Sequence, residues 1–421
     1  MKILQIHHSF PPSTYYGGPT WTTYCLCRAL AWAKQEVRVL TTNADGPKNI
    51  AVRVNQWYTI EGMRVLFGRR RARTLFSGAI YFGRREDWEW ADVVHFTGLF
   101  SLLLPIVAFR STRYRKPLVI SPRGSLIGAA LKRHSRRKRL FLATVGRYGI
   151  GRAAVFHATS ESEAEAVRGL AGSARVRVVP NGVEVPAVLP AREGTAGPYG
   201  LYLGRLHPYK RAERIIAGFA GATSRAGLGA RGKGEEGRRG IGARVDGGGR
   251  LVAGGRPDAG GEWSLVIAGD GEAAYRQDLE LVVAGAGLGR RVRFVGQVAG
   301  EEKARLLAGA EFVVLASYSE NFGMSVAEAL AHGTPSVVTK TAPWEGLDRE
   351  GCGFWVEDSD EGLTDGMRRL MALAPEERRA MGARGRAWMA RDFSWASVAR
   401  QMVAVYEELV QEARPGSANG G

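Results

Sequence analysis

The chain is expected to be an α/β protein built from two doubly wound domains, and three observations predict this. Its 421 residues, 45% of them hydrophobic, are enough for two full-sized cores. Short β-branched runs alternate with longer amphipathic segments, which is typical of βαβ units with parallel strands. The alternation pauses at 186–198, so the strands fall into two sets. Two such domains are expected to face each other across a cleft, where ligands of α/β proteins commonly bind.

The two sets of strands define the predicted domains, 1–185 and 199–390, with 186–198 as the linker. Strands are expected at 2–6, 37–41, 93–96, 118–121, 155–159 and 176–179, and then at 201–203, 264–268, 292–295, 312–316 and 336–339. Residues 391–421 are expected to form a C-terminal helix that packs back on the N-terminal domain, with a frayed tail. The glycine- and arginine-rich stretch 221–261 is interpreted as a flexible surface insertion.

Charge and cysteine content limit the candidate partners and the expected cellular location of the protein. The formal net charge is +18, from 59 Lys and Arg against 41 Asp and Glu, so nucleic acid, an anionic membrane and phosphorylated small molecules are all candidate partners. Three cysteines are too few for a disulfide framework and show no metal-binding spacing. The first residues predict a buried strand rather than a signal peptide, and no apolar run is long enough to span a bilayer. A cytoplasmic location is therefore expected.

The first chemistry-bearing motif is a basic turn that follows a predicted strand. It reads Gly-Arg-Leu-His-Pro-Tyr-Lys-Arg at 204–211, and its spacing can direct Arg205 and Lys210 toward one anion. A guanidinium binds phosphate oxygens with two donors and an ammonium supplies a point charge. The alternative is a solvated basic helix start. Because cations at a helix N-terminus oppose the helix dipole, we favour a phosphate-binding role.

The second motif places two carboxylates around the start of a helix. It reads Glu-Asn-Phe-Gly at 320–323, and the predicted helix 325–332 contains Glu328. Free N–H groups at a helix start suit phosphate. Glu320, in the loop, can accept hydrogen bonds from sugar hydroxyls, and Glu328 from a ribose diol. Ser325-x-x-Glu328 is also a capping-box pattern, so a structural role for Glu328 remains open. Together, the two motifs suit a nucleotide-sugar.

These motifs resemble glycosyltransferase family 4, the group 1 retaining enzymes of GT-B architecture. The matching features follow the family's order along the chain. They are Gly17-Gly18, Pro-Asn-Gly-Val at 180–183, the turn with Arg205 and Lys210, Ile-Ala-Gly-Asp-Gly at 267–271, and the motif with Glu320 and Glu328. Only the insertion 221–261 lies outside the pattern. Pro-Arg-Gly at 122–124 and Pro-Trp-Glu at 343–345 are similar to branches that make bacterial exopolysaccharide and lipopolysaccharide.

The resemblance implies a role for each of these residues. Arg205 and Lys210 would hold the donor diphosphate and stabilise it as it leaves, and Glu320 would contact the transferred sugar. The backbone at Phe322-Gly323 would approach the donor, with Glu328 on the ribose. It further implies transfer with retained anomeric configuration and without a metal or other cofactor, from a UDP- or GDP-sugar to a lipid-linked glycan.

Other positions at the expected cleft are assigned less directly. The resemblance implies that Gly17-Gly18 form the loop that lets the N-terminal domain approach donor phosphate and acceptor. Many relatives carry a histidine after the fourth strand, where this chain has Arg123. An arginine keeps its proton at neutral pH, so Arg123 is expected to contact phosphate or acceptor rather than act as a base. His95, at a strand end, is a second candidate contact, with a structural role as the alternative.

Two charged runs invite further interpretation. Asp-Ser-Asp at 358–360 resembles a metal-binding pattern, but its place before a predicted helix favours a helix cap. The basic run 132–139 adjoins apolar residues, and Arg136, Arg137 and Arg139 are expected to contact an anionic membrane. Peripheral attachment to the inner face of the plasma membrane follows. Nucleic acid is not expected, because the run lacks interleaved aromatic residues.

Two other functions remain as alternatives to sugar transfer. A different nucleotide-sugar reaction on the same fold, such as epimerisation, would need an acid/base pair near the sugar carbon, and no convincing second pair is visible. A non-catalytic, basic membrane- or nucleic-acid-binding protein on a degenerate transferase fold is the other. The intact Arg205, Lys210, Glu320 and Glu328 argue against degeneracy.

Overall fold

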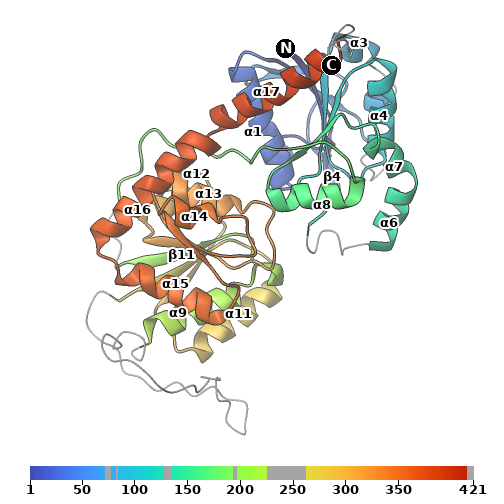
Figure 1. The fold of residues 1–421 in the computed structure, drawn as a ribbon. Coiled ribbons are helices and arrows are strands. Elements are labelled where there is room, and N and C mark those ends of the chain that lie inside the picture. Colours follow the sequence, from blue (N-terminus) through green and yellow to red (C-terminus); the bar gives the residue numbers. More distant parts are fainter. Residues whose placement is uncertain (72–76, 82–83, 128–134, 193–196, 225–261, 415–421) are drawn as a thin grey trace. The chain divides into compact units, whose positions relative to one another are not determined.

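The computed structural model describes residues 1–71, 77–81, 84–127, 135–192, 197–224 and 262–414, and divides the chain into two compact units. The first unit contains residues 1–182 together with 392–421, and the second contains 183–391. Both ends of the chain therefore belong to the same unit (Figure 1). The predicted insertion 221–261 lies outside the described residues from 225 onward, and so does the tail from 415.

The N-terminal unit is built on an eight-stranded sheet with the order β10-β9-β8-β7-β1-β2-β6-β5. All pairings are parallel except β5 with β6. The strands of the unit, which include the small β3–β4 pair, are β1 (Lys2–Ile6), β2 (Glu36–Thr42), β3 (Ala44–Asp45), β4 (Lys48–Asn49), β5 (Trp57–Ile60), β6 (Met63–Gly68), β7 (Val93–Thr97), β8 (Leu118–Ser121), β9 (Val155–Ala158) and β10 (Val176–Val178).

Helices cover both faces of this sheet, because successive residues of a buried strand point to opposite sides. Ile3 belongs to the core cluster that contains α1 and α17, whereas Leu4 belongs to the cluster with α4. The described helices of the unit are α1 (Gly18–Trp32), α2 (Gly78–Tyr81), α3 (Arg85–Trp90), α4 (Leu103–Arg113), α6 (Ser135–Ala143), α7 (Val145–Ile150), α8 (Glu161–Ala171) and α17 (Trp395–Glu412).

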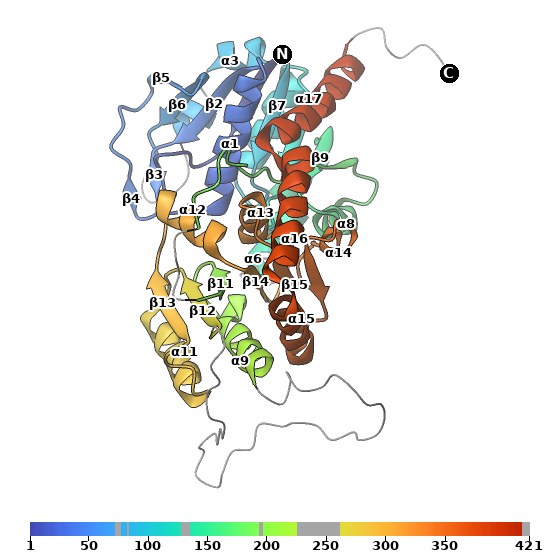
Figure 2. The same cartoon turned by 90° about the vertical axis from the view of Figure 1, so that its left-hand side faces the viewer.

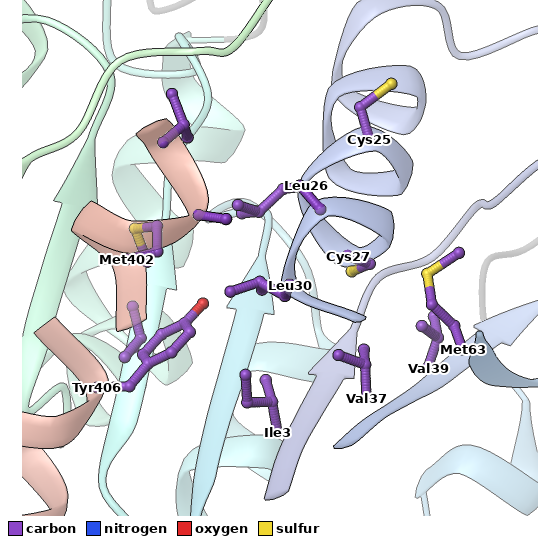
Figure 3. Close-up of a cluster of buried hydrophobic side chains, with 14 of the residues drawn as sticks. Ile3, Cys25, Leu26, Cys27, Leu30, Val37, Val39, Met63, Met402 and Tyr406 are labelled. Atoms are coloured by element: carbon purple, nitrogen blue, oxygen red, sulfur yellow. The ribbon is translucent and has the colours of Figure 1, made fainter. Parts of the chain in front are cut away.

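The C-terminal helix α17 completes one face of the N-terminal core. Figure 3 shows Met402 and Tyr406 from α17 beside Leu26 and Leu30 from α1, and these side chains are fully buried. The apolar residues of α17 recur at helical spacing, which gives the helix one buried face. Glu408 on the same helix forms ion pairs with two arginines of the neighbouring segment that includes β10.

The second unit is a six-stranded parallel sheet with the order β13-β12-β11-β14-β15-β16. Its strands are β11 (Tyr199–Leu203), β12 (Ser264–Ala268), β13 (Val292–Gly296), β14 (Phe312–Leu315), β15 (Ser336–Thr339) and β16 (Gly353–Val356). The strand order reverses direction at β11, where β12 lies on one side and β14 on the other. In open α/β sheets such a switch point is where ligands bind, beyond the carboxyl ends of the strands.

Helices also cover both faces of the second sheet. One core cluster packs α9, α11 and α15 on one face, and another packs α12 and α13 on the opposite face (Figure 2). The described helical elements of the unit are η1 (Pro208–Lys210), α9 (Ala212–Thr223), α11 (Ala273–Gly285), α12 (Gly300–Gly309), α13 (Met324–Ala331), α14 (Gly346–Arg349), α15 (Asp360–Ala372) and α16 (Pro375–Trp388). The helical turn η2 (Met389–Phe393) continues from this unit into the first unit.

Candidate active site

The basic turn lies at the carboxyl end of β11, at the switch point of the second sheet. The backbone N–H of Gly204 donates to the carbonyl of Ala268 at 3.0 Å, and that of Leu206 donates to the carbonyl of Asp270 at 2.9 Å. Arg205 stands between these two anchored residues, and its side chain is exposed. The predicted phosphate ligand therefore has a fixed backbone and a guanidinium that is open to solvent.

Two glycines of the neighbouring loop allow this close contact. A Cβ added to Gly269 would lie 1.8 Å from the carbonyl oxygen of Gly204, and one added to Gly271 would lie 1.8 Å from that of Leu206. Gly269 also has a φ of +147°, which residues other than glycine rarely adopt. The Gly-Asp-Gly sequence therefore allows the loops after β11 and β12 to pack closely, and this packing sets the backbone position of Arg205.

The two sequence motifs meet through an ion pair between Lys210 and Glu320. The hydroxyl of Ser317 donates to the same Glu320 oxygen, Oε1, at 2.7 Å, and the backbone N–H of Glu320 donates to the carbonyl of Thr341 at 3.1 Å. The Lys210 and Glu320 side chains are 29% and 13% exposed, so the pair is accessible to a ligand mainly from the lysine side. The cation predicted for phosphate and the carboxylate predicted for sugar are thus direct neighbours.

The turn at Phe322-Gly323 has a shape that only glycine fits well. Gly323 is the N-cap of α13, with a φ of +85°, and an added Cβ would lie 3.0 Å from a Leu315 methyl group. The indole N–H of Trp344 donates to the carbonyl of Phe322, and the two rings lie 5.2 Å apart. The Phe322 side chain is buried, so the backbone is the part of this turn that is able to approach a ligand.

Glu328 does not form the capping box that its spacing allowed. Helix α13 begins at Met324 with Gly323 as N-cap, and no side chain caps it, because Ser325 already lies inside the first turn. The carboxylate of Glu328 instead pairs with the ammonium of Lys303, at 2.7 Å, from α12. Sequence reasoning missed Lys303, since one lysine in a polar helix gives no signal of its own. The ribose role of Glu328 stays a prediction.

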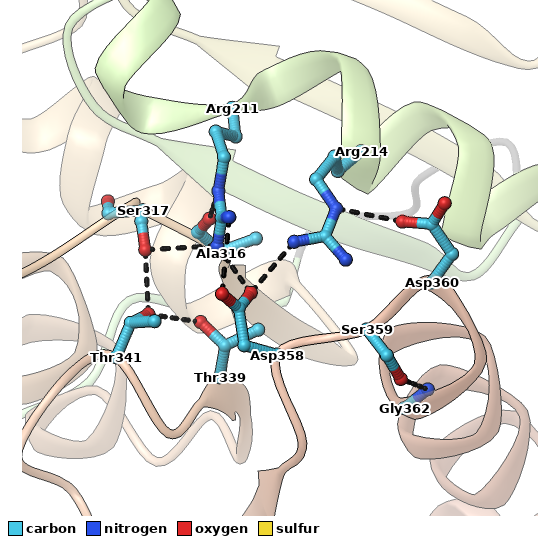
Figure 4. A network of polar contacts seen from close by, with 10 residues as sticks. All are labelled: Arg211, Arg214, Ala316, Ser317, Thr339, Thr341, Asp358, Ser359, Asp360 and Gly362. Carbon is cyan, nitrogen blue, oxygen red and sulfur yellow. Dashed lines mark hydrogen bonds and ion pairs between the residues drawn. The ribbon is translucent and has the colours of Figure 1, made fainter.

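The acidic run 358–360 caps a helix, as predicted. The Ser359 hydroxyl accepts from the backbone N–H of Gly362 at 3.0 Å, at the start of α15. Asp358 and Asp360 form ion pairs with Arg211 and Arg214 (Figure 4). Within the described residues, no three His, Cys, Asp or Glu side chains gather as a candidate metal site.

In the N-terminal unit, Gly17-Gly18 form the start of α1 beyond the end of β1. Gly17 is the N-cap with a φ of +64°, and a Cβ added to either glycine would meet nothing within 4 Å. The loop is therefore open rather than packed. An exposed helix start without acidic residues in its first turn is suited to an anion, and the predicted approach to donor phosphate stays a prediction.

Arg123 is half-buried and held by one of the motif residues. Its Nη1 donates to the amide oxygen of Asn181, from the Pro-Asn-Gly-Val motif, while its buried Nε has no partner among the described residues. Burial lowers the pKa of Arg123 below that of an ordinary guanidinium, although Glu163 opposes the shift. The φ of +52° at Arg123 shows that its backbone is constrained as well. Its assigned contact with phosphate or acceptor stays a prediction.

His95 is an interior residue, and the structure does not favour the predicted substrate contact. It is fully buried, and its two ring nitrogens lie 2.6 Å from the Tyr406 hydroxyl and 2.6 Å from the Ser121 hydroxyl. Ser121 also contacts His157 at 2.8 Å. Burial, together with the neighbouring His157, lowers the pKa of His95 well below 6.5, so the ring is neutral. The structural alternative for His95 fits these contacts.

The basic run that was predicted to contact a membrane lies partly outside the described residues, at 132–134. Arg136, Arg137 and Arg139 on α6 are exposed. The N-terminal unit contains a second basic run, Arg-Arg-Arg-Ala-Arg at 69–73. Residues 72 and 73 are not described, and Arg70 is buried with hydrogen bonds to Asn49 and to two backbone carbonyls. In the part of the chain that the structure describes, no helix is long and apolar enough to cross a bilayer.

The arrangement of two Rossmann-like units with parallel sheets is the GT-B architecture of glycosyltransferases, and solved structures share it. Sucrose-phosphate synthase from Thermosynechococcus elongatus aligns with a TM-score of 0.67 at 20% identity, over 97% of this chain and 99% of that one. Anabaena HepE in complex with UDP aligns with a TM-score of 0.69 at 16% identity, over 97% of this chain and 100% of that one.

Sequence comparisons define the family. The family model described as Glycosyltransferase Family 4 matches residues 16–185, and the one described as Glycosyl transferases group 1 matches residues 256–388. The chain belongs to the group 1, family 4 glycosyltransferases and is a glycosyltransferase.

Two named relatives illustrate the range of the family. A GDP-mannose:cellobiosyl-diphosphopolyprenol alpha-mannosyltransferase of Xanthomonas oryzae pv. oryzae is 25% identical over 322 residues, 76% of this chain and 75% of the relative. A D-inositol 3-phosphate glycosyltransferase of Nocardioides is 40% identical over 139 residues, which is 32% of this chain and 30% of the relative.

Proposed function

We propose that this glycosyltransferase moves a sugar from a UDP- or GDP-sugar to a lipid-linked glycan, with retention of anomeric configuration and without a metal. The observation that carries the proposal is the Lys210–Glu320 ion pair, which joins the cation turn to the carboxylate loop at the switch point of the second sheet. The Xanthomonas relative, which is named for a GDP-mannose donor and a diphosphopolyprenol-linked acceptor, supports the donor and acceptor classes.

The chemistry of transfer needs charge stabilisation more than acid or base groups. The bond between the anomeric carbon and the donor phosphate breaks, and negative charge collects on the departing nucleoside diphosphate. Arg205 and Lys210 stabilise that charge, together with the free N–H groups at the start of α13. In the retaining mechanism the acceptor oxygen attacks the face that the phosphate leaves. The departing phosphate takes the acceptor proton, so no basic side chain is required there.

Binding of the donor would exchange ion-pair partners within the site. Glu320 forms an ion pair with Lys210, and a diphosphate at Lys210 would compete for that ammonium. The carboxylate of Glu320 would then be released toward the sugar hydroxyls while Ser317 keeps one of its oxygens in place. An epimerase would need an acid/base pair at this position, and a carboxylate beside a lysine with a diphosphate role does not provide one. Sugar transfer is therefore favoured over epimerisation.

The test is a screen of donors with purified protein. UDP-, GDP- and ADP-sugars are assayed for donor hydrolysis and for thermal stabilisation, with Lys210→Ala, Glu320→Gln and the wild type in parallel. We expect one nucleotide class to stabilise the wild type, Lys210→Ala to lose that stabilisation, and Glu320→Gln to retain binding but lose turnover. Arg379→Ala, which removes an exposed ion pair on α16, is the matched control and should behave as wild type. Stabilisation by no nucleotide, or full turnover by both site variants, would refute the proposal.

We further propose that the α4, α6 and α7 face of the N-terminal unit attaches the enzyme to the inner face of the plasma membrane. Residues 93–160 contain 13 Lys and Arg and no Asp or Glu. Exposed apolar side chains lie in the same segment, at Leu102, Phe109 and Leu140. Cations beside exposed apolar groups suit an anionic bilayer surface, where each cation contributes about 1 kcal/mol.

Liposome sedimentation tests the membrane proposal. Replacing Arg136, Arg137 and Arg139 with Gln removes about 3 kcal/mol, which is roughly a hundredfold loss of binding to phosphatidylserine vesicles at low salt. A control that replaces Arg369, Arg379 and Arg384 of the second unit with Gln has the same net charge and should bind as wild type. Equal losses in the two triple variants would mean that net charge, rather than this face, determines binding.

A further inference from the structure

Three consecutive residues of the basic turn contact the loop 316–320 that carries Glu320. The Tyr209 carbonyl accepts from the backbone N–H of Tyr318 at 2.9 Å, and Lys210 forms an ion pair with Glu320. The third residue, Arg211, donates from Nε to the carbonyl of Ala316 at 2.7 Å and from Nη2 to the carbonyl of Ser317 at 3.3 Å. Of these residues, only Lys210 and Glu320 have a role in the proposed chemistry.

Resting on the proposed function, we propose that Arg211 is a positioning residue that holds the loop 316–320 in the geometry from which Glu320 meets the transferred sugar. The chain of contacts is short. Arg211 fixes the Ser317 backbone, and the Ser317 hydroxyl donates to the Glu320 carboxylate at 2.7 Å. Thr341 supports the loop from the other strand end, since its hydroxyl donates to the same Ser317 carbonyl at 2.6 Å.

The backbone at Arg211 indicates that its side chain has a specific task. Its φ of +52° lies in the left-handed region, which is unfavourable for a long side chain and easy for glycine. Arg211 is at once the residue that ends η1 and the N-cap of α9, with no side-chain cap bond. A turn of this shape has no need for a guanidinium. The contacts with Ala316, Ser317 and Asp358 provide the reason for one.

The Arg211 guanidinium is itself oriented by the carboxylate of Asp358. Figure 4 shows Arg211 between the carbonyl groups of the loop and Asp358, which it contacts through Nη1 at 3.2 Å and through Nη2. Arg214, one turn further along α9, also pairs with Asp358, at 2.7 Å, and with Asp360 at 2.8 Å. Among the described residues, the Arg214 side chain has hydrogen bonds and ion pairs with Asp358 and Asp360 and none with the loop 316–320, so the two arginines share Asp358 but only Arg211 contacts the loop.

This difference supplies a matched pair of variants, Arg211→Gln and Arg214→Gln. Both lose an ion pair with Asp358, and only Arg211→Gln loses the carbonyl contacts. Hydrogen exchange is measured at the amides of Tyr318 and Glu320, which are bonded to the Tyr209 and Thr341 carbonyls. We expect exchange at both amides to rise at least about tenfold in Arg211→Gln and to stay within about twofold of wild type in Arg214→Gln.

Kinetics then separate positioning from binding. In Arg211→Gln we expect kcat for transfer to fall about tenfold while the Kd of the nucleoside diphosphate stays within about twofold, because the diphosphate ligands Arg205 and Lys210 remain. Arg211→Lys, which keeps the charge and one donor, should recover part of the loss. Thr341→Val removes a second contact with the same loop, the hydrogen bond to the Ser317 carbonyl, and serves if Arg211→Gln does not fold. It should also raise exchange at the Glu320 amide.

The outcomes distinguish this proposal from the proposed function. Unchanged exchange at Tyr318 and Glu320 in Arg211→Gln, or equal effects in Arg214→Gln, would overturn the positioning role even if transfer falls. Raised exchange specific to Arg211→Gln, combined with a wild type that transfers sugar from no donor, would refute the proposed function and keep Arg211 as the residue that orders the loop.

Discussion

Replacing Gly269 with alanine should damage both the stability of the second unit and its affinity for nucleoside diphosphate. The new Cβ would lie 1.8 Å from the Gly204 carbonyl oxygen, and the φ of +147° is unfavourable for alanine, at a cost of about 1–3 kcal/mol. Relief of the clash requires the two loops to separate. That breaks the Gly204–Ala268 and Leu206–Asp270 backbone hydrogen bonds, each worth about 1 kcal/mol.

Together these contributions amount to about 3–5 kcal/mol, which corresponds to a thermal midpoint lower by roughly 10 °C for a unit of this size. Differential scanning calorimetry measures the shift, and titration calorimetry with UDP and GDP measures the loss of affinity that follows from moving Arg205. Gly289→Ala is the control, because a Cβ there meets nothing within 4 Å. A Gly269→Ala midpoint within about 2 °C of wild type would refute the close contact between the loops.

Three further predictions concern the N-terminal unit. Burial lowers the pKa of His157 to about 3 and that of His8 to about 4, and it lowers that of His95 well below 6.5. The unfolded chain binds these protons near pH 6.5 and the folded chain does not, so stability is complete above pH 6.5 and falls as the pH drops toward 4. A thermal midpoint that is equal at about pH 7.5 and pH 5 would contradict this. Trp395→Ala should lower the free energy of unfolding by about 3–5 kcal/mol in urea titrations, because the indole is buried in the core, and a change below about 1 kcal/mol would exclude that packing. Glu408→Gln should cost less than about 1 kcal/mol in the same assay, since its ion pairs are partly exposed, and a larger loss would show that they hold α17 in place.

Most parallel strands of both sheets were predictable because they are short, β-branched runs between turn signals. The antiparallel hairpin of β5 and β6 was not predicted from the sequence. Its two-residue turn is Glu61-Gly62, with φ of +49° and +81°, the conformation that such hairpin turns require. Without a strong Asn-Gly or Asp-Gly signal, the segment did not stand out among the loops. Strand β16 was not predicted either, because Gly-Phe-Trp-Val begins with a glycine and contains only one β-branched residue.

The candidate site was predictable at the level of motifs but not of contacts. The spacing of Arg205, Lys210 and Glu320 indicated chemistry, while the ion pair between Lys210 and Glu320 required two segments distant in sequence to meet. The capping box at Glu328 failed because the helix starts earlier than its serine suggested, which no local pattern reveals. Arg211 stood out only as the last residue of the basic turn, with no role of its own. Its importance comes from carbonyl groups of another loop, and sequence carries no information on where a carbonyl points.

The division of the chain has a consequence for biosynthesis. The core of the N-terminal unit includes Trp395, Val398, Met402, Tyr406 and Leu409, all from the last helix. A nascent chain therefore exposes the apolar faces of α1 and the first sheet until α17 has been synthesised, whereas the second unit, continuous from 183 to 391, has its entire sequence available earlier. The second unit can therefore complete its core before the first, which needs α17.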